Sequence, residues 1–428
     1  MSAPYVSVIV PIRDNLQGLE FTVRSLAAQD LPLDEWEVIV VDDGSAVPAA
    51  GTAEPFGLAN LQVVRLYPGV GRSKGRNHGI RSARGEVVLM LDGDSFAAPD
   101  LVRRHAEFHR NMDPEAPRVL LSNQFEPSWA TVNRLIDGDV AVPKIAIEQD
   151  RRQSMFGVEA SAISRSRIPW AYFFTHALSV RRQDLEAVGG FDEEFEGWGL
   201  EDVDLGYRLF EAAGRPDGLF MQDPKAYTFA VPHYRDFRRQ SAEEQHNMEI
   251  FRRKHPRYDV ELFYGSRTYT DAKVAYYEGV LDSFRSDTAG ELRTSDLAAA
   301  IESPSSVLLI GGTPPPARLG RTVTWNHRAP ADSDNLHLFG LWTPFKDAEF
   351  DDVVHVDLWR FLIPEDLLLL IAESLRIATR LRLISTALSR PGPERRECDV
   401  DFLLRMLDGR LRLALSEIQT GQIITIER

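Results

Sequence analysis

Five apolar residues that run directly into two carboxylates most constrain what this chain can fold into. The run is Val87–Leu91, and Asp92, Gly93 and Asp94 follow it. Its length and composition are typical of a strand buried on both faces in the middle of a parallel sheet, and ligands bind where such strands end. Without a cation, the two carboxylates would repel each other, and hard divalent cations prefer oxygen ligands. The sequence therefore predicts a metal ion held by Asp92 and Asp94, with a plain Asp-Gly turn as the alternative.

Alternating strand and helix patterns lead up to this run. Strand patterns cover residues 6–11, 37–41 and 63–66, and helical periodicity over residues 16–26 connects the first two. This alternation predicts a parallel sheet with right-handed crossovers. We expect further strands at residues 119–122, 177–181 and 227–231, and helices at residues 201–213 and 237–254.

The 428 residues predict two domains. We expect an α/β domain over residues 1–255, a helical connection over residues 256–300 and a smaller α/β domain over residues 301–428.

The smaller domain resembles a class I methyltransferase in residues 343–354 and 380–387. Its expected cofactor-binding half differs from that family, because Gly311-Gly312 leads into three prolines at 314–316, which lack an N–H, and Asn326-His327-Arg328 replaces an acidic residue. We expect a degenerate Rossmann-like module that does not bind S-adenosylmethionine. Its predicted role is to dock an acceptor or partner, or to form a homo-oligomer contact.

The net charge of −15 argues against nucleic acid or an anionic membrane surface as the main partner. A single cysteine excludes a disulfide framework. The apolar stretches are too short to span a bilayer, and the N-terminus does not resemble a signal peptide. These features predict a cytoplasmic protein without a membrane span.

Two acidic residues, Asp42 and Asp43, follow the second predicted strand and would share a sheet edge with Asp92. Acidic side chains at that position can accept hydrogen bonds from a nucleoside, and a turn cap is the alternative.

A glycine-rich, basic stretch covers residues 69–77. Backbone amides at a helix start and nearby cations suit a diphosphate, whereas a solvated basic face is the alternative. The stretch predicts donor-binding roles for Gly71, Arg72, Lys74 and Asn77.

Glu201 and Asp202 begin a predicted helix behind Gly197-Trp198-Gly199. The helix dipole would keep such a carboxylate ionised near neutral pH, which predicts a general base. Trp198 offers an apolar platform for a sugar ring, and Gly199 allows a ligand to approach the backbone. Acidic residues that only complement the dipole are the alternative.

His233 follows the last predicted strand of this domain. A lone histidine is more often structural than a ligand. Beside two carboxylates, however, a neutral imidazole suits Mn²⁺ or a similar ion.

The order and spacing of these motifs resemble the family 2 glycosyltransferases with the GT-A fold over about the first 255 residues. The motifs that carry the resemblance are Ser7–Pro11, Val40–Ser45, Gly75–Asn77, Leu91–Ser95 and Gly197–Asp202. The last also resembles the acceptor-side motif of galactosyltransferases and chondroitin polymerases. The resemblance implies an α/β fold, with a Rossmann-like mixed sheet flanked by helices, and a nucleotide-diphosphate-sugar donor, usually a UDP-sugar.

The resemblance also implies how the donor is held. Asp42 or Asp43 would contact the base, and Pro11 and Arg13 would line the same pocket.

The metal and the chemistry follow from the same resemblance. Asp92 and Asp94 match the DXD motif, so Asp94 would ligate Mn²⁺ or Mg²⁺ and Asp92 would touch the ribose or the metal. His233 matches a late metal-binding histidine. The implied reaction is an inverting displacement, with Asp202 as general base and Glu201 holding the acceptor hydroxyls.

The acceptor is left open as a glycan, a peptide or a small molecule. The alternative from another class is a catalytically silent nucleotide-sugar-binding or scaffold protein, against which the retained carboxylates argue. A nucleotidyltransferase is disfavoured because no glycine-rich basic loop follows the first strand. A bifunctional methyltransferase is the least favoured interpretation.

Overall fold

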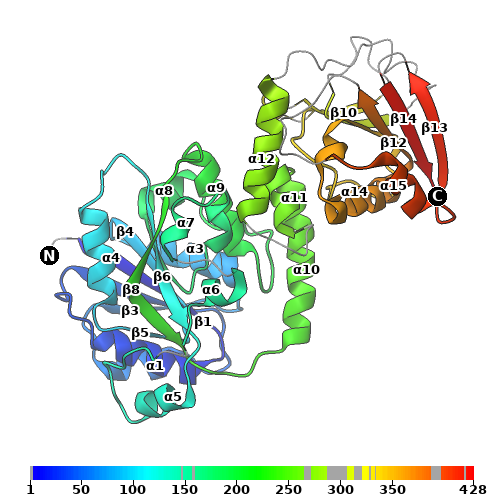
Figure 1. Ribbon diagram of the computed structural model, residues 1–428. Coiled ribbons are helices and arrows are strands. Elements are labelled where there is room, and N and C mark those ends of the chain that lie inside the picture. The colour runs from blue at the N-terminus through cyan, green and yellow to red at the C-terminus, as the bar shows by residue number, and fades with distance from the viewer. Residues whose placement is uncertain are drawn as a thin grey trace. The chain divides into compact units, whose positions relative to one another are not determined.

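The computed structural model describes residues 3–145, 148–156, 160–264, 271–286, 306–312, 321–326, 329–332, 334–386, 397–418 and 421–428. The chain divides into two compact units, Met1–Ile250 and Phe251–Arg428 (Figure 1). We describe each unit by itself.

The first unit contains a mixed sheet in the order β3-β2-β1-β4-β7-β6-β8-β5. The first four strands in that order are parallel, and β7 is antiparallel to both of its neighbours. The strands are β1 (Val6–Ile12), β2 (Trp36–Asp42), β3 (Leu61–Arg65), β4 (Val87–Leu91), β5 (Ser95–Ala97), β6 (Val119–Phe125), β7 (Ala177–Arg181) and β8 (Phe220–Ala230). The predicted α/β class is confirmed.

Helices cover both faces of this sheet. Leu19, Val23 and Leu26 of α1 join a core with alternate residues of β1, β2 and β4, to which α2 and α4 also contribute. On the other face, a Cβ at Gly79 of α3 would lie 2.4 Å from Ile9 Cγ2, so glycine lets this helix pack closely. The helices of the unit are α1 (Leu16–Ala27), α2 (Ala50–Ala53), α3 (Arg72–Ser82), α4 (Leu101–Arg110), α5 (Trp129–Ile136), α6 (Arg151–Phe156), α7 (Ala160–Ile163), α8 (Arg182–Ala187), α9 (Glu201–Ala212) and α10 (Phe237–Lys254), with 3₁₀ turns at Glu54–Phe56 and Pro169–Tyr172.

The apolar run Val87–Leu91 forms β4 with the predicted bounds and is fully buried. Its environment differs in part from the prediction, because β1 is parallel to it and β7 is antiparallel. Short β5 was not predicted, since three residues carry no usable periodicity. β8 starts at Phe220, seven residues before the predicted strand, because its polar first half pairs in parallel with β6.

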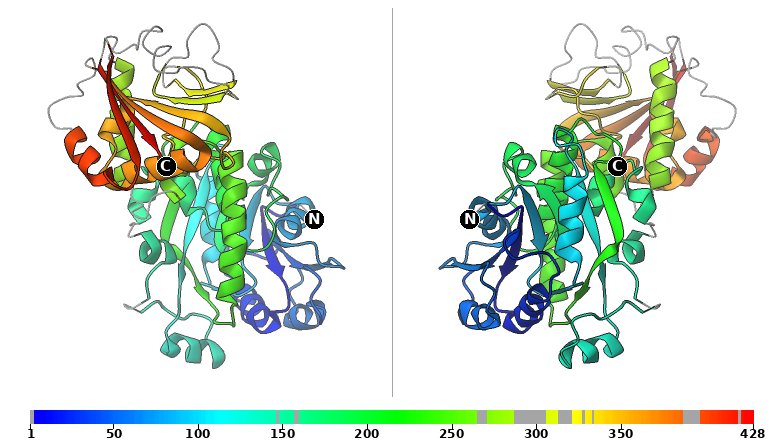
Figure 2. Two further views of the ribbon diagram at one scale, coloured as in Figure 1. Left: turned by 90° about the vertical axis from the view of Figure 1, so that its right-hand side faces the viewer. Right: turned by 90° about the vertical axis from the view of Figure 1, so that its left-hand side faces the viewer.

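The second unit has its own sheet in the order β10-β9-β11-β12-β14-β13. The first four strands are parallel, and β14 is antiparallel to both β12 and β13, which can be followed from yellow to red in Figure 2. Its elements are β9 (Ser306–Ile310), β10 (Arg321–Trp325), β11 (Phe350–Val356), β12 (Ala378–Thr386), β13 (Arg412–Ile418), β14 (Gly421–Glu427), α11 (Tyr258–Tyr264), α12 (Asp271–Ser286), α14 (Pro364–Ile377), α15 (Val400–Leu407) and a 3₁₀ turn at Leu358–Phe361.

Helices α11 and α12, predicted as a connection, belong to this unit. Glu261 of α11 accepts hydrogen bonds from four consecutive backbone N–H groups, those of residues 339–342. From α12, Lys273 Nζ lies 2.7 Å from Asp366 Oδ1, and the Tyr277 hydroxyl donates to the same carboxylate at 2.6 Å. The resemblance to a methyltransferase stays a prediction, and residues 313–316, 327, 328 and 387 lie outside the described residues.

Within the described ranges, no helix has both the length and the apolar composition needed to cross a bilayer.

Candidate active site

The predicted donor residues lie where the parallel strands of the first unit end. Pro11 is the next-to-last residue of β1, Asp42 is the last residue of β2, and Asp92 follows β4 directly. Since these neighbouring strands are parallel, their carboxyl ends share one edge, where ligands bind in open α/β sheets.

Asp94 lies beside His233, which follows β8. Asp94 Oδ2 is 3.0 Å from His233 Nδ1 and 3.7 Å from Arg235 Nη2. Burial alone would raise the pKa of Asp94, but hydrogen bonding and charge from His233, with the charge of Arg235, hold it below its usual range. The hydrogen bond to Asp94 in turn raises the pKa of His233. Two of the three predicted metal ligands are therefore together.

Asp92 faces a different partner. Its Oδ1 lies 3.2 Å from Arg76 Nη2 of α3, and Arg76 Nη1 lies 3.2 Å from Glu201 Oε1. Burial raises the pKa of Asp92, Arg76 opposes that rise and Asp94 adds to it. The prediction that Asp92, Asp94 and His233 converge is thus not matched: among the described residues, no group of three or more His, Cys, Asp and Glu could hold a metal.

Asp94 and His233 nevertheless fit a divalent cation. A carboxylate oxygen and an imidazole nitrogen suit Mn²⁺, while Mg²⁺ favours oxygen ligands. Asp94 and His233 would hold such an ion from the protein side, and the ion would supply positive charge next to the donor.

The acceptor motif is built by glycines and a strained residue. Gly197 and Gly199 have φ of 73° and 100°, and Leu200 has φ of 67°, immediately before α9. Positive φ is costly for leucine and free for glycine, so this turn is the kind of strained segment that gathers at functional sites. It places Glu201 and Asp202 in the first turn of α9.

The two carboxylates of this motif differ in environment. Glu201 is buried against Arg76, and its Oε2 has no hydrogen-bond partner in the described structure. Asp202 is partly exposed and accepts a hydrogen bond from Val203 N at 2.8 Å. Burial raises the pKa of Asp202 to about 7, the charge of Glu201 adds to the rise, and Arg76 opposes it. Burial and the charge of Glu201 thus act against the ionised form of Asp202, which the helix dipole was expected to favour.

Trp198 and Gly199 are partly exposed and are braced by α10. Trp198 N donates to Glu243 Oε2 at 2.9 Å, and Asn247 Nδ2 donates to Gly199 O at 2.7 Å. The predicted acceptor platform therefore lies on a turn that is fixed from behind.

Asn77 is engaged by the protein itself. Its side chain exchanges hydrogen bonds with both the N–H and the C=O of Phe191, and its Nδ2 also donates to Glu193. The amide therefore ties α3 to the turn that leads to Gly197. Both polar atoms of the Asn77 side chain are therefore already hydrogen-bonded within the protein, although Asn77 was predicted to contact the donor.

Asp42 is likewise engaged. It is fully buried and accepts hydrogen bonds from Ser45 N, Ala49 N and Arg65 Nη1. Burial alone would raise the pKa of Asp42, but these partners hold it below its usual range. Of the two residues predicted to contact the base, only Asp43 retains any exposure.

Asp43 accepts hydrogen bonds from the backbone N–H groups of Val70 and Gly71, and so fixes the glycine-rich turn before α3. Arg13 Nη1 lies 4.0 Å from Asp43 Oδ2 and is largely exposed. Arg72 is exposed and Lys74 is partly exposed. The structure thus leaves these three predicted donor-binding cations at least partly accessible.

Two basic residues near the motifs were not among the predicted site residues. Arg76 stands inside the quoted Gly75–Asn77 motif, so the signal was present, but its contacts to Asp92 and Glu201 are long-range. Arg235 lies two residues after His233, and that adjacency could have indicated it.

The first unit is similar in sequence to known protein families. Residues 7–158 match the model of glycosyl transferase family 2, and residues 158–239 match the model of the N-terminal domain of galactosyltransferase. Residues 7–158 form a family 2 glycosyltransferase domain. This glycosyltransferase carries both matches within its first unit, and the predicted GT-A fold agrees with them.

Three named relatives are similar to this chain in sequence. Validoxylamine A glucosyltransferase of Streptomyces hygroscopicus is 27% identical over 391 residues, covering 82% of this chain and 90% of that protein. Pre-mycofactocin glycosyltransferase of Mycobacterium tuberculosis is 28% identical over 219 residues, covering 49% of this chain and 40% of that protein. Chondroitin synthase of Escherichia coli is 27% identical over 221 residues, covering 48% of this chain and 32% of that protein.

Among solved structures, Staphylococcus aureus TarS in complex with UDP-GlcNAc is 20% identical with a TM-score of 0.44, covering 64% of this chain and 70% of that chain.

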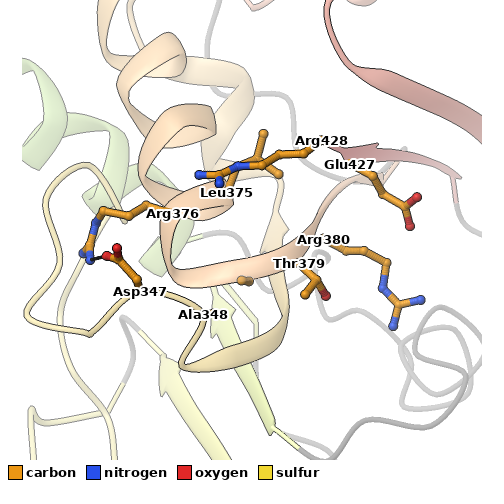
Figure 3. Close-up of a pocket in the computed structure, with 9 residues that line it drawn as sticks. Asp347, Ala348, Leu375, Arg376, Thr379, Arg380, Glu427 and Arg428 are labelled. Atoms are coloured by element: carbon orange, nitrogen blue, oxygen red, sulfur yellow. Dashed lines mark hydrogen bonds and ion pairs between the residues drawn. The ribbon is translucent and has the colours of Figure 1, made fainter.

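A surface cavity of about 540 Å³ lies in the second unit, and none of its lining residues belongs to these motifs (Figure 3). Of the three arginines that line it, Arg376 pairs with Asp347 and Arg380 pairs with Asp352. Ala378, the first residue of β12, also lines it, so it lies at the edge opposite the carboxyl ends where ligands usually bind.

Proposed function

We propose that this glycosyltransferase is metal-dependent and inverting, and that it moves a sugar from a UDP-sugar to an acceptor hydroxyl with Asp202 as the general base. The observation that carries the proposal is the environment of Asp202. A partly exposed carboxylate whose pKa is about 7 is about half ionised at neutral pH. That balance suits a general base, which must accept a proton in one step and release it afterwards.

The proposed step is a single displacement. Asp202 takes the proton of the acceptor hydroxyl, and the acceptor oxygen forms a bond to the anomeric carbon. The bond from that carbon to the diphosphate oxygen breaks, and its electron pair leaves with UDP. Attack opposite the leaving group inverts the anomeric centre. Glu201 Oε2, which is buried without a partner in the described structure, supports a role in accepting a hydrogen bond from the acceptor.

The leaving diphosphate needs positive charge. Arg13, Arg72, Lys74 and Arg235 supply it from the protein. A Mn²⁺ or Mg²⁺ ion held by Asp94 and His233 would supply further charge stabilisation to the leaving group.

The match to validoxylamine A glucosyltransferase supports an acceptor of the same kind as validoxylamine A. The match to validoxylamine A glucosyltransferase covers 82% of this chain, which is more than the first unit alone contains. We therefore propose glucosyl transfer to a small-molecule acceptor, with the second unit contributing to acceptor docking. A glycan acceptor is the second choice, favoured by the partial match to chondroitin synthase.

A panel of nucleotide sugars tests the proposal. UDP-glucose, UDP-galactose, UDP-GlcNAc, GDP-glucose and GDP-mannose would each be tested with Mn²⁺ for thermal stabilisation, because binding to the folded state raises its stability. The stabilising donor would then be incubated with validoxylamine A and with water alone, and UDP release would be followed. A UDP-sugar that stabilises the protein only with Mn²⁺ and then releases UDP supports the proposal. The proposal would be overturned if no UDP-sugar stabilised the protein, or if UDP release were unchanged when a chelator removed the metal.

A further inference from the structure

We infer that Arg76 is a positioning residue that couples the donor site to the acceptor site. The inference rests on the proposed function for the identity of the two sites. It concerns the chain of contacts from Asp92, beside the donor, through Arg76 to Glu201, beside the acceptor.

The contacts of Arg76 set it apart from a structural arginine. Its two terminal nitrogens each lie 3.2 Å from one carboxylate, Nη2 from Asp92 and Nη1 from Glu201. Its Nε has no hydrogen-bond partner in the part of the chain that the structure describes. The only hydrogen-bond acceptors of this guanidinium among the described residues therefore belong to the two motifs. Phe191, whose ring centroid lies 5.5 Å from Cζ, packs against it.

Arg181 provides the contrast. Its side chain is 3% exposed and that of Arg76 is 4% exposed, so the two are buried alike. Arg181 donates to the backbone carbonyls of Asp113, Pro114 and Ala116, as an arginine that holds a loop does.

The electrostatics of Arg76 favour coupling. One buried cation serves Asp92 and Glu201 and also acts on the nearby charge of Asp202. Two carboxylates share one guanidinium, so a change at one alters how strongly the other is held. A donor that engages Asp92 leaves Arg76 to hold Glu201 more firmly in the acceptor site. By reciprocity, loss of Glu201 strengthens the hold of Arg76 on Asp92 and weakens donor binding.

A lysine cannot reproduce this arrangement. A guanidinium presents its donors in a planar fork that can meet two carboxylates at once, while an ammonium is a compact point charge. Arg76→Lys should therefore keep the charge and lose most of the coupling.

A binding cycle tests the inference without knowledge of the acceptor. The Kd of UDP with Mn²⁺ would be measured by calorimetry for wild type, Glu201→Gln, Arg76→Gln and the double variant. We expect Glu201→Gln to weaken UDP binding by about fivefold or more in the wild-type background and to have no further effect beside Arg76→Gln. Arg181→Gln is the matched control, and beside it the effect of Glu201→Gln should persist.

If Arg76→Gln does not fold, Arg76→Lys takes its place. In the Arg76→Lys background, the change in log Kd of UDP caused by Glu201→Gln should be less than about half of the change in the wild-type background. An equal effect of Glu201→Gln in the wild-type and both Arg76 backgrounds would overturn the inference alone. If wild type binds no nucleoside diphosphate at all, the proposed function falls and the inference falls with it.

Discussion

Asp94 Oδ2 and His233 Nδ1 lie 3.0 Å apart, although one residue follows β4 and the other follows β8. The fold brings them together because β5, directly after Asp94, pairs antiparallel with the end of β8. In addition, Val231 N donates to Asp94 O at 2.7 Å, which fixes the two segments at this point. The short strand that carries no signal in the sequence thus assembles the proposed metal pair.

Removal of either member of this pair should abolish metal-dependent donor binding. We expect the thermal stabilisation by UDP with Mn²⁺ to disappear in Asp94→Asn and in His233→Ala, because one remaining side chain holds the cation too weakly. Differential scanning fluorimetry with and without Mn²⁺ measures this. His78→Ala, a partly exposed histidine of α3, is the control and should keep the full stabilisation. Unchanged stabilisation in both test variants would remove these residues from the metal site.

Asp202→Asn should lose transfer while it keeps the donor. We expect the kcat of UDP release with acceptor to fall by about a hundredfold or more, because an amide cannot accept the proton. The Kd of UDP with Mn²⁺ should stay within about twofold, since Asp202 belongs to the acceptor side. Glu211→Gln, at an exposed position on the same helix, serves as the control. A kcat near that of wild type would assign the base to another residue.

The pH dependence of transfer follows from the pKa of Asp202, about 7. The base acts when ionised, so kcat/KM should rise with pH, change slope near neutral pH and level off above it. Steady-state rates from acidic to mildly alkaline pH, at saturating Mn²⁺, measure this profile. A plateau that extends down to about pH 5 would mean that the base ionises as an ordinary aspartate does.

Stability should respond to the same carboxyl group with the opposite sign. The pKa of Asp202 is raised in the folded state above its unfolded value of about 3.9, so the unfolded state releases this proton first as pH rises. The folded protein therefore loses stability between about pH 4 and pH 7 through this residue. Asp202→Asn should be more stable than wild type by about 1–3 kcal/mol at about pH 8 and equal to it near pH 4. Denaturant titrations at the two pH values check this, and equal stability at both would contradict the raised pKa.

Asn77→Ala should act on stability. The substitution leaves the N–H and C=O of Phe191 without their buried partner, which we expect to lower the free energy of unfolding by about 1–3 kcal/mol. Urea denaturation measures the change. His78→Ala, at a partly exposed position of the same helix, should change the free energy of unfolding by less than about 0.5 kcal/mol. Equal effects of the two substitutions would show that the hydrogen bonds between Asn77 and Phe191 contribute nothing to stability.

Strands β1, β2 and β4 of the first sheet could be predicted from the sequence because their apolar runs are buried on both faces. Val87–Leu91 has no polar residue to mislead the pattern, and the structure keeps its predicted bounds. The first half of β8 fails for the opposite reason, since Phe220–Lys225 is largely polar and pairs only because β6 lies beside it. Pairing between distant segments leaves no local signal.

The same distinction separates the site residues. Residue type and position indicate that Asp94, Glu201 and Asp202 lie near a ligand. They do not show that the side chains of Asp42 and Asn77 form hydrogen bonds within the protein. The partners of these side chains, Arg65 and Phe191, come from distant segments of the sequence. Residue type and position also do not predict that Arg76 donates to both Glu201 and Asp92, because these two acceptors are far from it and from each other in the sequence.

The anomeric configuration of the product tests the proposed displacement most directly. The sugar of UDP-glucose is α-linked. Its transfer to the acceptor or to water would be started in the presence of Mn²⁺, and proton NMR would record the configuration of the product immediately afterwards. We predict a β-configured product at early times from the wild-type protein and none from Asp202→Asn. An α-configured product, or equal product from the Asp202→Asn variant, would contradict an inverting displacement with Asp202 as its base.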